Sequence, residues 1–190
     1  MHFPAYTYFG TSDFSAAILN GLVEAGEVPQ LVVSTSAKPA GRGLAATLSP
    51  VANLARLRGF PLLEVSTLRT PETQAKLANV ATKLGILAAF GKILPSAVLE
   101  LYPRGIINVH PSLLPLYRGP SPIVGTLLHG DATTGVSLML LDSEVDHGPI
   151  LEQEQAAISE VDTASTLTAL LTQLAVKMLL STVPDYIAGT

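Results

Sequence analysis

The stretch Asn108-Val109-His110-Pro111-Ser112-Leu113-Leu114-Pro115-Leu116-Tyr117-Arg118-Gly119 follows directly on a short apolar run, Gly105-Ile106-Ile107. The β-branched residues of that run predict a buried strand. Because side chains alternate along a strand, Asn108 and His110 point to the same side, and Pro111 ends the pairing. The carboxyl end of a strand is where open α/β sheets bind ligands. An Asn-x-His pair by itself is more typical of a buried structural histidine, but the residues that follow favour a functional site.

Composition limits the class of protein. The chain has 190 residues, of which 48% are hydrophobic and 14% charged, and this indicates one compact, soluble α/β domain. The net charge of −4 gives no general attraction to nucleic acid. The absence of cysteine excludes disulfides and thiolate zinc sites and fits a cytoplasmic protein. No apolar run approaches the length of a membrane span, and no signal peptide opens the sequence, so we expect no membrane contact.

Periodicity and turn residues predict a Rossmann-like α/β fold: an open, mostly parallel (mixed) twisted sheet with helices on both faces. The first strand is followed by one glycine where a dinucleotide fingerprint needs three, which argues against a dinucleotide site. The predicted strands cover residues 6–9, 31–33, 61–64, 84–90, 105–107, 136–141 and 149–153. The predicted helices cover residues 14–25, 71–80, 120–129 and 162–182, with further helices beginning at Pro50 and Pro95.

Two loops and the end of the chain complete this outline. Residues 38–47 carry two cations among glycine and proline and are expected to form an exposed mobile loop. Residues 142–148 carry three carboxylates without a compensating cation, a pattern usual for a solvated turn. Pro184 is expected to break the last helix. We therefore predict a catalytic domain over residues 1–183 and the start of a linker over residues 184–190.

Three ordered motifs carry a resemblance to a known family. Asn108-x-His110, the following Ser112-to-Gly119 segment and Asp146-x-Gly148-x-Ile150 resemble the formyltransferases that use 10-formyltetrahydrofolate. Within that superfamily, Lys38-to-Gly43 and Tyr117-to-Ile123 are similar to the methionyl-tRNA formyltransferases. The resemblance covers nearly the whole chain. It implies that 10-formyltetrahydrofolate is the formyl donor and charged initiator tRNA the acceptor.

The resemblance also implies a catalytic set of Asn108, His110 and Asp146. Formyl transfer from N10 of folate to an amine passes through a tetrahedral intermediate with an oxyanion. Asn108 and His110 could donate hydrogen bonds to that oxygen. His110 and Asp146 could move a proton from the amine to N10, with Asp146 orienting the imidazole. The chemistry needs no metal, and four scattered histidines suggest no metal site.

The folate is expected between two loops, and the tRNA on a third. In the family the pterin is held largely by backbone groups, so we expect cofactor contacts from Phe90, Gly91, Lys92, Ile93, Leu94, Ser137, Asp142 and Val145. The predicted tRNA contacts are Lys38, Gly41, Arg42 and Gly43. We expect a monomer.

Two departures from the family leave the acceptor open. Methionyl-tRNA formyltransferases usually carry a C-terminal β-barrel, and this sequence is expected to stop where the linker to that barrel would begin, either as a domain of a longer protein or as a chain that binds tRNA weakly. The basic loop of this chain continues Leu44-Ala45-Ala46-Thr47 where further lysine would be expected. Both departures remove positive charge that would bind tRNA phosphates. Formylation of glycinamide ribonucleotide or of an amino-sugar nucleotide, hydrolysis of formyltetrahydrofolate, and folate binding without turnover remain alternatives.

Overall fold

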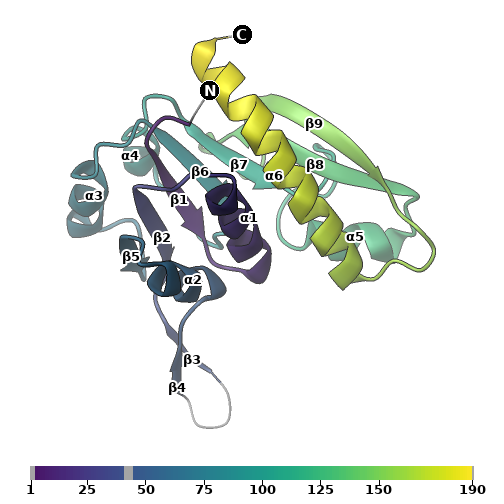
Figure 1. Cartoon of the computed structure of the whole chain (residues 1–190), viewed down its shortest axis with the longest axis horizontal. Coiled ribbons are helices and arrows are strands. Elements are labelled where there is room, and N and C mark those ends of the chain that lie inside the picture. Colours follow the sequence, from purple (N-terminus) through teal and green to yellow (C-terminus); the bar gives the residue numbers. More distant parts are fainter. Residues whose placement is uncertain (1–2, 41–44, 190) are drawn as a thin grey trace. The chain divides into compact units, whose positions relative to one another are not determined.

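The computed structural model describes residues 3–40 and 45–189. Residue contacts divide the chain into two compact units, Pro4–Ile106 and Ile107–Thr190, with the first three residues assigned to the latter. Figure 1 labels the helices and strands of both units.

The first unit is built on parallel strands in the order β5-β2-β1-β6. Three of these strands are buried along their whole length, as expected for parallel strands covered on both faces. Their bounds are β1 (Tyr6–Gly10), β2 (Leu31–Thr35), β5 (Leu62–Val65) and β6 (Leu84–Ala88). All four strands appear close to their predicted positions.

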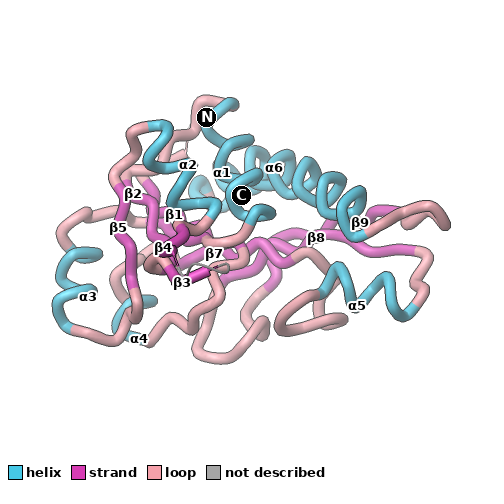
Figure 2. The backbone as a smooth tube through the Cα atoms, turned by 90° about the horizontal axis from the view of Figure 1, so that it is seen from below, coloured by secondary structure: helices cyan, strands magenta, loops and turns pink. Residues whose placement is uncertain are grey.

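Helices cover both faces of these strands. Figure 2 shows α1 and α2 above the strands and α3 and α4 below them. Right-handed crossovers produce this arrangement, since the chain first moves outward from β1 to β5 and then returns to β6. The bounds are α1 (Asp13–Glu24), α2 (Pro50–Arg58), α3 (Pro71–Ala78) and α4 (Ser96–Leu99). Ser12 and Ser49 cap α1 and α2, where their hydroxyls accept hydrogen bonds from Ser15 N–H and Ala52 N–H.

The segment expected as an irregular loop contains an antiparallel ribbon. β3 (Lys38–Ala40) pairs with β4 (Ala45–Thr47), and Figure 1 shows the ribbon extending away from the rest of its unit. The prediction missed these strands because backbone pairing over three residues needs no hydrophobic period. Of the predicted tRNA contacts, Lys38 lies in β3, whereas Gly41, Arg42 and Gly43 lie outside the described residues.

The second unit is built on antiparallel strands in the order β7-β8-β9. These are β7 (Ile106–His110), β8 (Thr133–Leu140) and β9 (Ile150–Ala157). The helix α5 (Pro122–His129) precedes β8. β9 ends four residues later than predicted, because antiparallel pairing with β8 supports its polar sequence Glu-Gln-Glu-Gln. With parallel strands in one unit and antiparallel strands in the other, the α/β class is confirmed.

The last helix, α6 (Ala164–Ala188), packs against β8 and β9. The residues that it buries recur at helical spacing: Leu167, Leu171, Ala175, Met178, Leu179 and Val183. By length and a mean hydropathy of 1.4 it is also long and apolar enough to cross a membrane, although 39% of that window is buried within the protein. The expectation that no apolar segment approaches a membrane span is therefore wrong by this criterion, since alanine, valine and methionine add to the apolar leucine pattern.

The expected helix break at Pro184 is also wrong. α6 continues to Ala188 and ends at Gly189, which adopts φ 79°. Proline removes the backbone hydrogen bond to the residue four positions earlier and crowds that carbonyl, while Val183 beside it is fully buried in the helix. The predicted domain boundary at residue 183 stays a prediction.

Candidate active site

The structure brings Asn108, His110 and Asp146 together within the second unit. Asn108 and His110 lie on the same side of β7, as alternation predicts, and both side chains are buried. Asn108 Nδ2 donates to Asp146 Oδ1 at 3.1 Å, and His110 Nδ1 lies 3.5 Å from Asp146 Oδ2. The latter is an ion-pair distance, slightly longer than a normal hydrogen bond. The three predicted catalytic residues thus form one polar cluster.

Asp146 is held from three sides. Besides contacting Asn108 and His110, its Oδ2 accepts a hydrogen bond from Gly119 N–H at 2.8 Å. Its backbone lies in the left-handed region, at φ 47°. Residues other than glycine are uncommon there, and such positions concentrate at functional sites. The loop between β8 and β9 therefore presents this carboxylate in a fixed orientation.

His110 has a partner that the sequence did not indicate. Its Nε2 lies 2.9 Å from the backbone carbonyl oxygen of Tyr117. A carbonyl can only accept, so Nε2 carries a hydrogen and donates it. In this arrangement the Nε2–H is engaged by the Tyr117 carbonyl, and the expected donation from His110 to the oxyanion stays a prediction. Asn108 retains a second amide hydrogen beyond the one that it donates to Asp146.

Ser137, predicted to contact the cofactor, supports the loop after β7. The side chain is completely buried. Its hydroxyl donates to the Ser112 carbonyl at 2.6 Å and accepts from Leu114 N–H at 3.0 Å and Gln153 Nε2 at 2.8 Å. The hydroxyl is enclosed and its hydrogen bonds lie within the protein. A folate contact of Ser137 stays a prediction.

The substitution Ser137→Ala is expected to destabilise the protein by about 2 kcal/mol or more, since it leaves buried groups of Ser112 and Leu114 without a partner. The free energy of unfolding from urea titrations measures this loss. Ser143→Ala, at an exposed serine of the same unit, is the control and is expected to change little. Equal stability of the two variants would contradict the role assigned to Ser137.

Asp142, another predicted cofactor residue, is engaged within its own loop. Its carboxylate accepts from Glu144 N–H at 2.8 Å and lies 2.8 Å from His147 Nδ1. The hydrogen bond with His147 is the largest cause that lowers the pKa of Asp142, and the hydrogen bond from the Glu144 backbone is the second largest. Val145, also a predicted cofactor residue, is exposed. Folate contacts of Asp142 and Val145 stay predictions.

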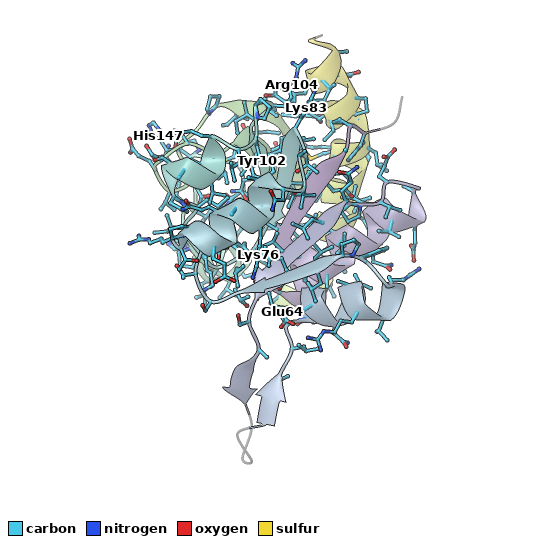
Figure 3. The ribbon with its side chains drawn as sticks, turned by 90° about the vertical axis from the view of Figure 1, so that its left-hand side faces the viewer. Glu64, Lys76, Lys83, Tyr102, Arg104 and His147 are labelled. Carbon is cyan, nitrogen blue, oxygen red and sulfur yellow. The ribbon has the colours of Figure 1, made fainter. Side chains whose placement is uncertain are left out.

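The pairing of Asp142 with His147 also shifts the pKa of His147, which Figure 3 labels. The hydrogen bond to Asp142 is the main cause that raises the pKa of His147 above 6.5, and the charge of Glu144 adds to it. Its stabilising contribution is complete below 6.5 and is lost as the pH rises through the raised pKa. The contribution of Asp142 is present above its usual pKa and is lost as the pH falls through the lowered value.

An NMR titration of His147 is expected to give a midpoint above 6.5 in the wild-type chain. Asp142→Ala should bring that midpoint back toward 6.5, because the main cause of the rise is removed. Ser143→Ala on the same loop serves as the control and should leave the midpoint unchanged. A midpoint that Asp142→Ala does not alter would contradict the pairing.

The remaining predicted cofactor residues belong to the first unit. Phe90 and Leu94 are buried, and the Phe90 carbonyl accepts from the Thr11 hydroxyl at 2.8 Å. Gly91 adopts φ 73°, and Ile93 is exposed. Lys92 Nζ donates to the Ser66 carbonyl, a contact that the sequence did not indicate. Direct folate contacts from these five residues stay predictions.

A cavity of about 240 Å³ lies beside Tyr117 in the second unit. Its lining combines apolar groups with a carboxylate and three hydroxyls: Leu113, Leu116, Tyr117, Asp131, Ala132, Thr133 and Thr134. Among residues 3–40 and 45–189, no three His, Cys, Asp or Glu side chains lie together as a metal site would require.

An α/β fold with an amide, an imidazole and a carboxylate converging at a strand end has the groups that acyl transfer to an amine requires. Residues 5–183 match the model of the formyl transferase family, and the chain belongs to that family. The resemblance inferred from the motifs is thereby confirmed.

Curated relatives carry a more specific name. A methionyl-tRNA formyltransferase of Roseiflexus sp. (strain RS-1) is 41% identical over 96% of this chain and 56% of its own length. One of Myxococcus xanthus is 40% identical over 98% of this chain and 59% of its own length. The chain therefore spans less than two thirds of the length of these relatives.

Solved structures support the fold. A phosphoribosylglycinamide formyltransferase from Bacillus halodurans has a TM-score of 0.79 at 23% identity, covering 97% of this chain and 95% of that chain. A sugar N-formyltransferase from a Shewanella species has a TM-score of 0.71 at 19% identity, covering 98% of this chain and 70% of that chain.

Proposed function

We propose that this chain transfers the formyl group of 10-formyltetrahydrofolate to the free amino group of methionyl-initiator-tRNA. The observation that carries the proposal is the cluster of Asn108, His110 and Asp146, with their polar atoms 3.1 and 3.5 Å apart. The acceptor is inferred from relatives at about 40% identity that are named methionyl-tRNA formyltransferase. A cytoplasmic monomer that uses no metal fits this proposal.

The reaction forms one C–N bond and breaks another. The amine attacks the formyl carbon, the carbonyl oxygen becomes an oxyanion, and the bond to N10 breaks as N10 takes up a proton. Asn108 donates its second amide hydrogen to the oxyanion, and loss of one such donor typically lowers the rate roughly 100- to 1000-fold. The amide is held for this role by its other bond, to Asp146.

His110 and Asp146 transfer the proton released by the amine. Tyr117 holds the Nε2–H of His110, so Nδ1 is the ring nitrogen that faces the Asp146 carboxylate. A proton taken up between Nδ1 and Oδ2 is available to N10 when the leaving group departs. The carboxylate stabilises the imidazolium that forms in between.

The binding surfaces follow from the predicted loops. We propose that Phe90, Gly91, Lys92, Ile93 and Leu94 contribute backbone contacts to the folate, and that Asp142 and Val145 contribute from the other loop. We propose that Lys38, Gly41, Arg42 and Gly43 contact the acceptor end of the tRNA. Arginine at position 42 could pair with a phosphate or a base edge through two parallel hydrogen bonds.

A panel of acceptors tests the proposal. Formyl donor labelled in the formyl group is offered with charged initiator tRNA, glycinamide ribonucleotide or an amino-sugar nucleotide. We expect label in the tRNA fraction, dependent on His110. Transfer only to one of the small amines would replace the proposed acceptor. Release of free formate with no acceptor labelled would favour hydrolysis instead.

Arg42→Ala is expected to raise the KM for charged tRNA or to lower its turnover, with the affinity for the formyl donor unchanged. Arg69→Ala is the matched control, since Arg69 is an exposed arginine of the same unit outside the predicted loop. Unchanged formylation of tRNA by Arg42→Ala would contradict the proposed role of this loop.

A further inference from the structure

Tyr117 joins the candidate active site to a second group of residues. Its backbone carbonyl accepts the Nε2–H of His110 at 2.9 Å. At the other end of the same residue, the phenol hydroxyl donates to the Asp131 carboxylate. The ring also packs edge-to-face on His129, with centroids 5.5 Å apart and an interplanar angle of 67°. One residue thus contacts the catalytic imidazole through its backbone and is anchored through its side chain.

The backbone of Tyr117 needs such an anchor. Its φ of 57° lies in the left-handed region, which costs a residue with a side chain roughly 1–2 kcal/mol. A rotation to the right-handed region would turn the carbonyl away from His110. The hydrogen bond to Asp131 opposes that rotation because it fixes the far end of the side chain.

The helix α5 restricts the ring further. A Cβ atom added to Gly125 would lie 3.0 Å from Tyr117 Cδ1, so the ring sits directly against the helix at its one glycine. The carbonyl of Gly125 in turn accepts from His129 Nδ1 at 2.9 Å, which holds the histidine that the ring packs on. The Tyr117 ring is therefore confined between α5 and Asp131.

The direction of the Tyr117–Asp131 bond is also fixed. The hydrogen bond to Asp131 is the main cause that raises the pKa of Tyr117, with smaller effects of burial and of the carboxylate charge. The phenol therefore stays protonated at neutral pH and continues to donate.

We propose that Tyr117 and Asp131 are positioning residues for His110. Their hydrogen bond keeps the Tyr117 carbonyl where it receives the Nε2–H, and this selects the nitrogen of His110 that faces Asp146. The inference rests on the proposed function in so far as it takes His110 to be catalytic. Neither residue needs to touch substrate in this role.

The test uses three substitutions in the full chain. Tyr117→Phe and Asp131→Ala remove the hydrogen bond, while Asp131→Asn keeps an oxygen that accepts from the phenol. ¹⁵N–¹H NMR of His110, assigned by comparison with His110→Ala, reports which ring nitrogen carries the hydrogen. We expect mainly Nε2–H in the wild type and Asp131→Asn, and a mixture of Nε2–H and Nδ1–H in the other two.

Kinetics provide the second readout. Turnover is expected to fall roughly 10- to 100-fold in Tyr117→Phe and Asp131→Ala, as for a displaced catalytic group, with the KM for the formyl donor changed less than about twofold. Asp131→Asn should restore most of the turnover. A merely structural role would lower thermal stability without shifting the His110 tautomer, and that result would overturn the proposal.

A further variant covers the case in which Tyr117→Phe does not fold. Gly125→Ala displaces the Tyr117 ring without removing a polar group, and it should shift the tautomer in the same direction. An unshifted tautomer in the folded variants overturns the positioning role even if the wild type transfers formyl groups. A shifted tautomer in a chain that transfers none refutes the proposed function and leaves the positioning role standing.

Discussion

His110→Ala is expected to lower formyl-transfer turnover more than about 100-fold while the fold survives. The substitution removes the imidazole that faces Asp146 at 3.5 Å and the partner of the Tyr117 carbonyl. Turnover with labelled formyl donor measures the loss, and circular dichroism and thermal melting show whether the protein stays folded.

Asn108→Ala and Asp146→Ala are expected to cause losses of the same order, since one removes the oxyanion donor and the other the group that orients it. Glu144→Ala is the control because Glu144 is an exposed carboxylate of the same loop. Near-normal turnover of His110→Ala, with the control equally active, would contradict the proposed mechanism.

Gly148→Ala is expected to destabilise the protein by about 3 kcal/mol or more and to reduce turnover severely. A Cβ atom at this position would lie 2.0 Å from the backbone oxygen of Leu140. Neither the backbone at Leu140 nor the backbone at Gly148 can shift at little cost, because Leu140 N–H donates a hydrogen bond to the Pro149 carbonyl at 2.9 Å. The displacement would also move Asp146, which lies two residues earlier in the same loop.

Urea unfolding measures the change in stability, and Ser143→Ala on the same loop is the control. A Gly148→Ala chain that unfolds at the wild-type urea concentration would contradict the packing described for this loop. If stability falls but turnover does not, the position of Asp146 is less important for catalysis than proposed.

Local signals account for the parts of the fold that could be predicted. Ser12 and Ser49 cap helices by bonding residues three positions later, which is a pattern readable from the sequence. The apolar run in β6 indicates a buried parallel strand. The strand period alone places Asn108 and His110 on one side of β7.

Long-range contacts account for what the sequence did not reveal. Ser137 looked available for a ligand, but residues 16 to 25 positions away enclose it and use its hydroxyl. The contact of Tyr117 with His110 is made by a backbone carbonyl, which no residue type signals. The continuation of α6 through Pro184 likewise depends on packing that exceeds the loss of one backbone bond.

The most direct test of the central claim is a double-mutant cycle on the rate of labelled formyl transfer in a single turnover. In the proposed mechanism Asn108 and Asp146 act as one unit, joined by a 3.1 Å hydrogen bond. The double variant Asn108→Ala/Asp146→Ala should then be little slower than the slower of the two single variants. A double variant slowed by the full product of the two single effects would contradict the account.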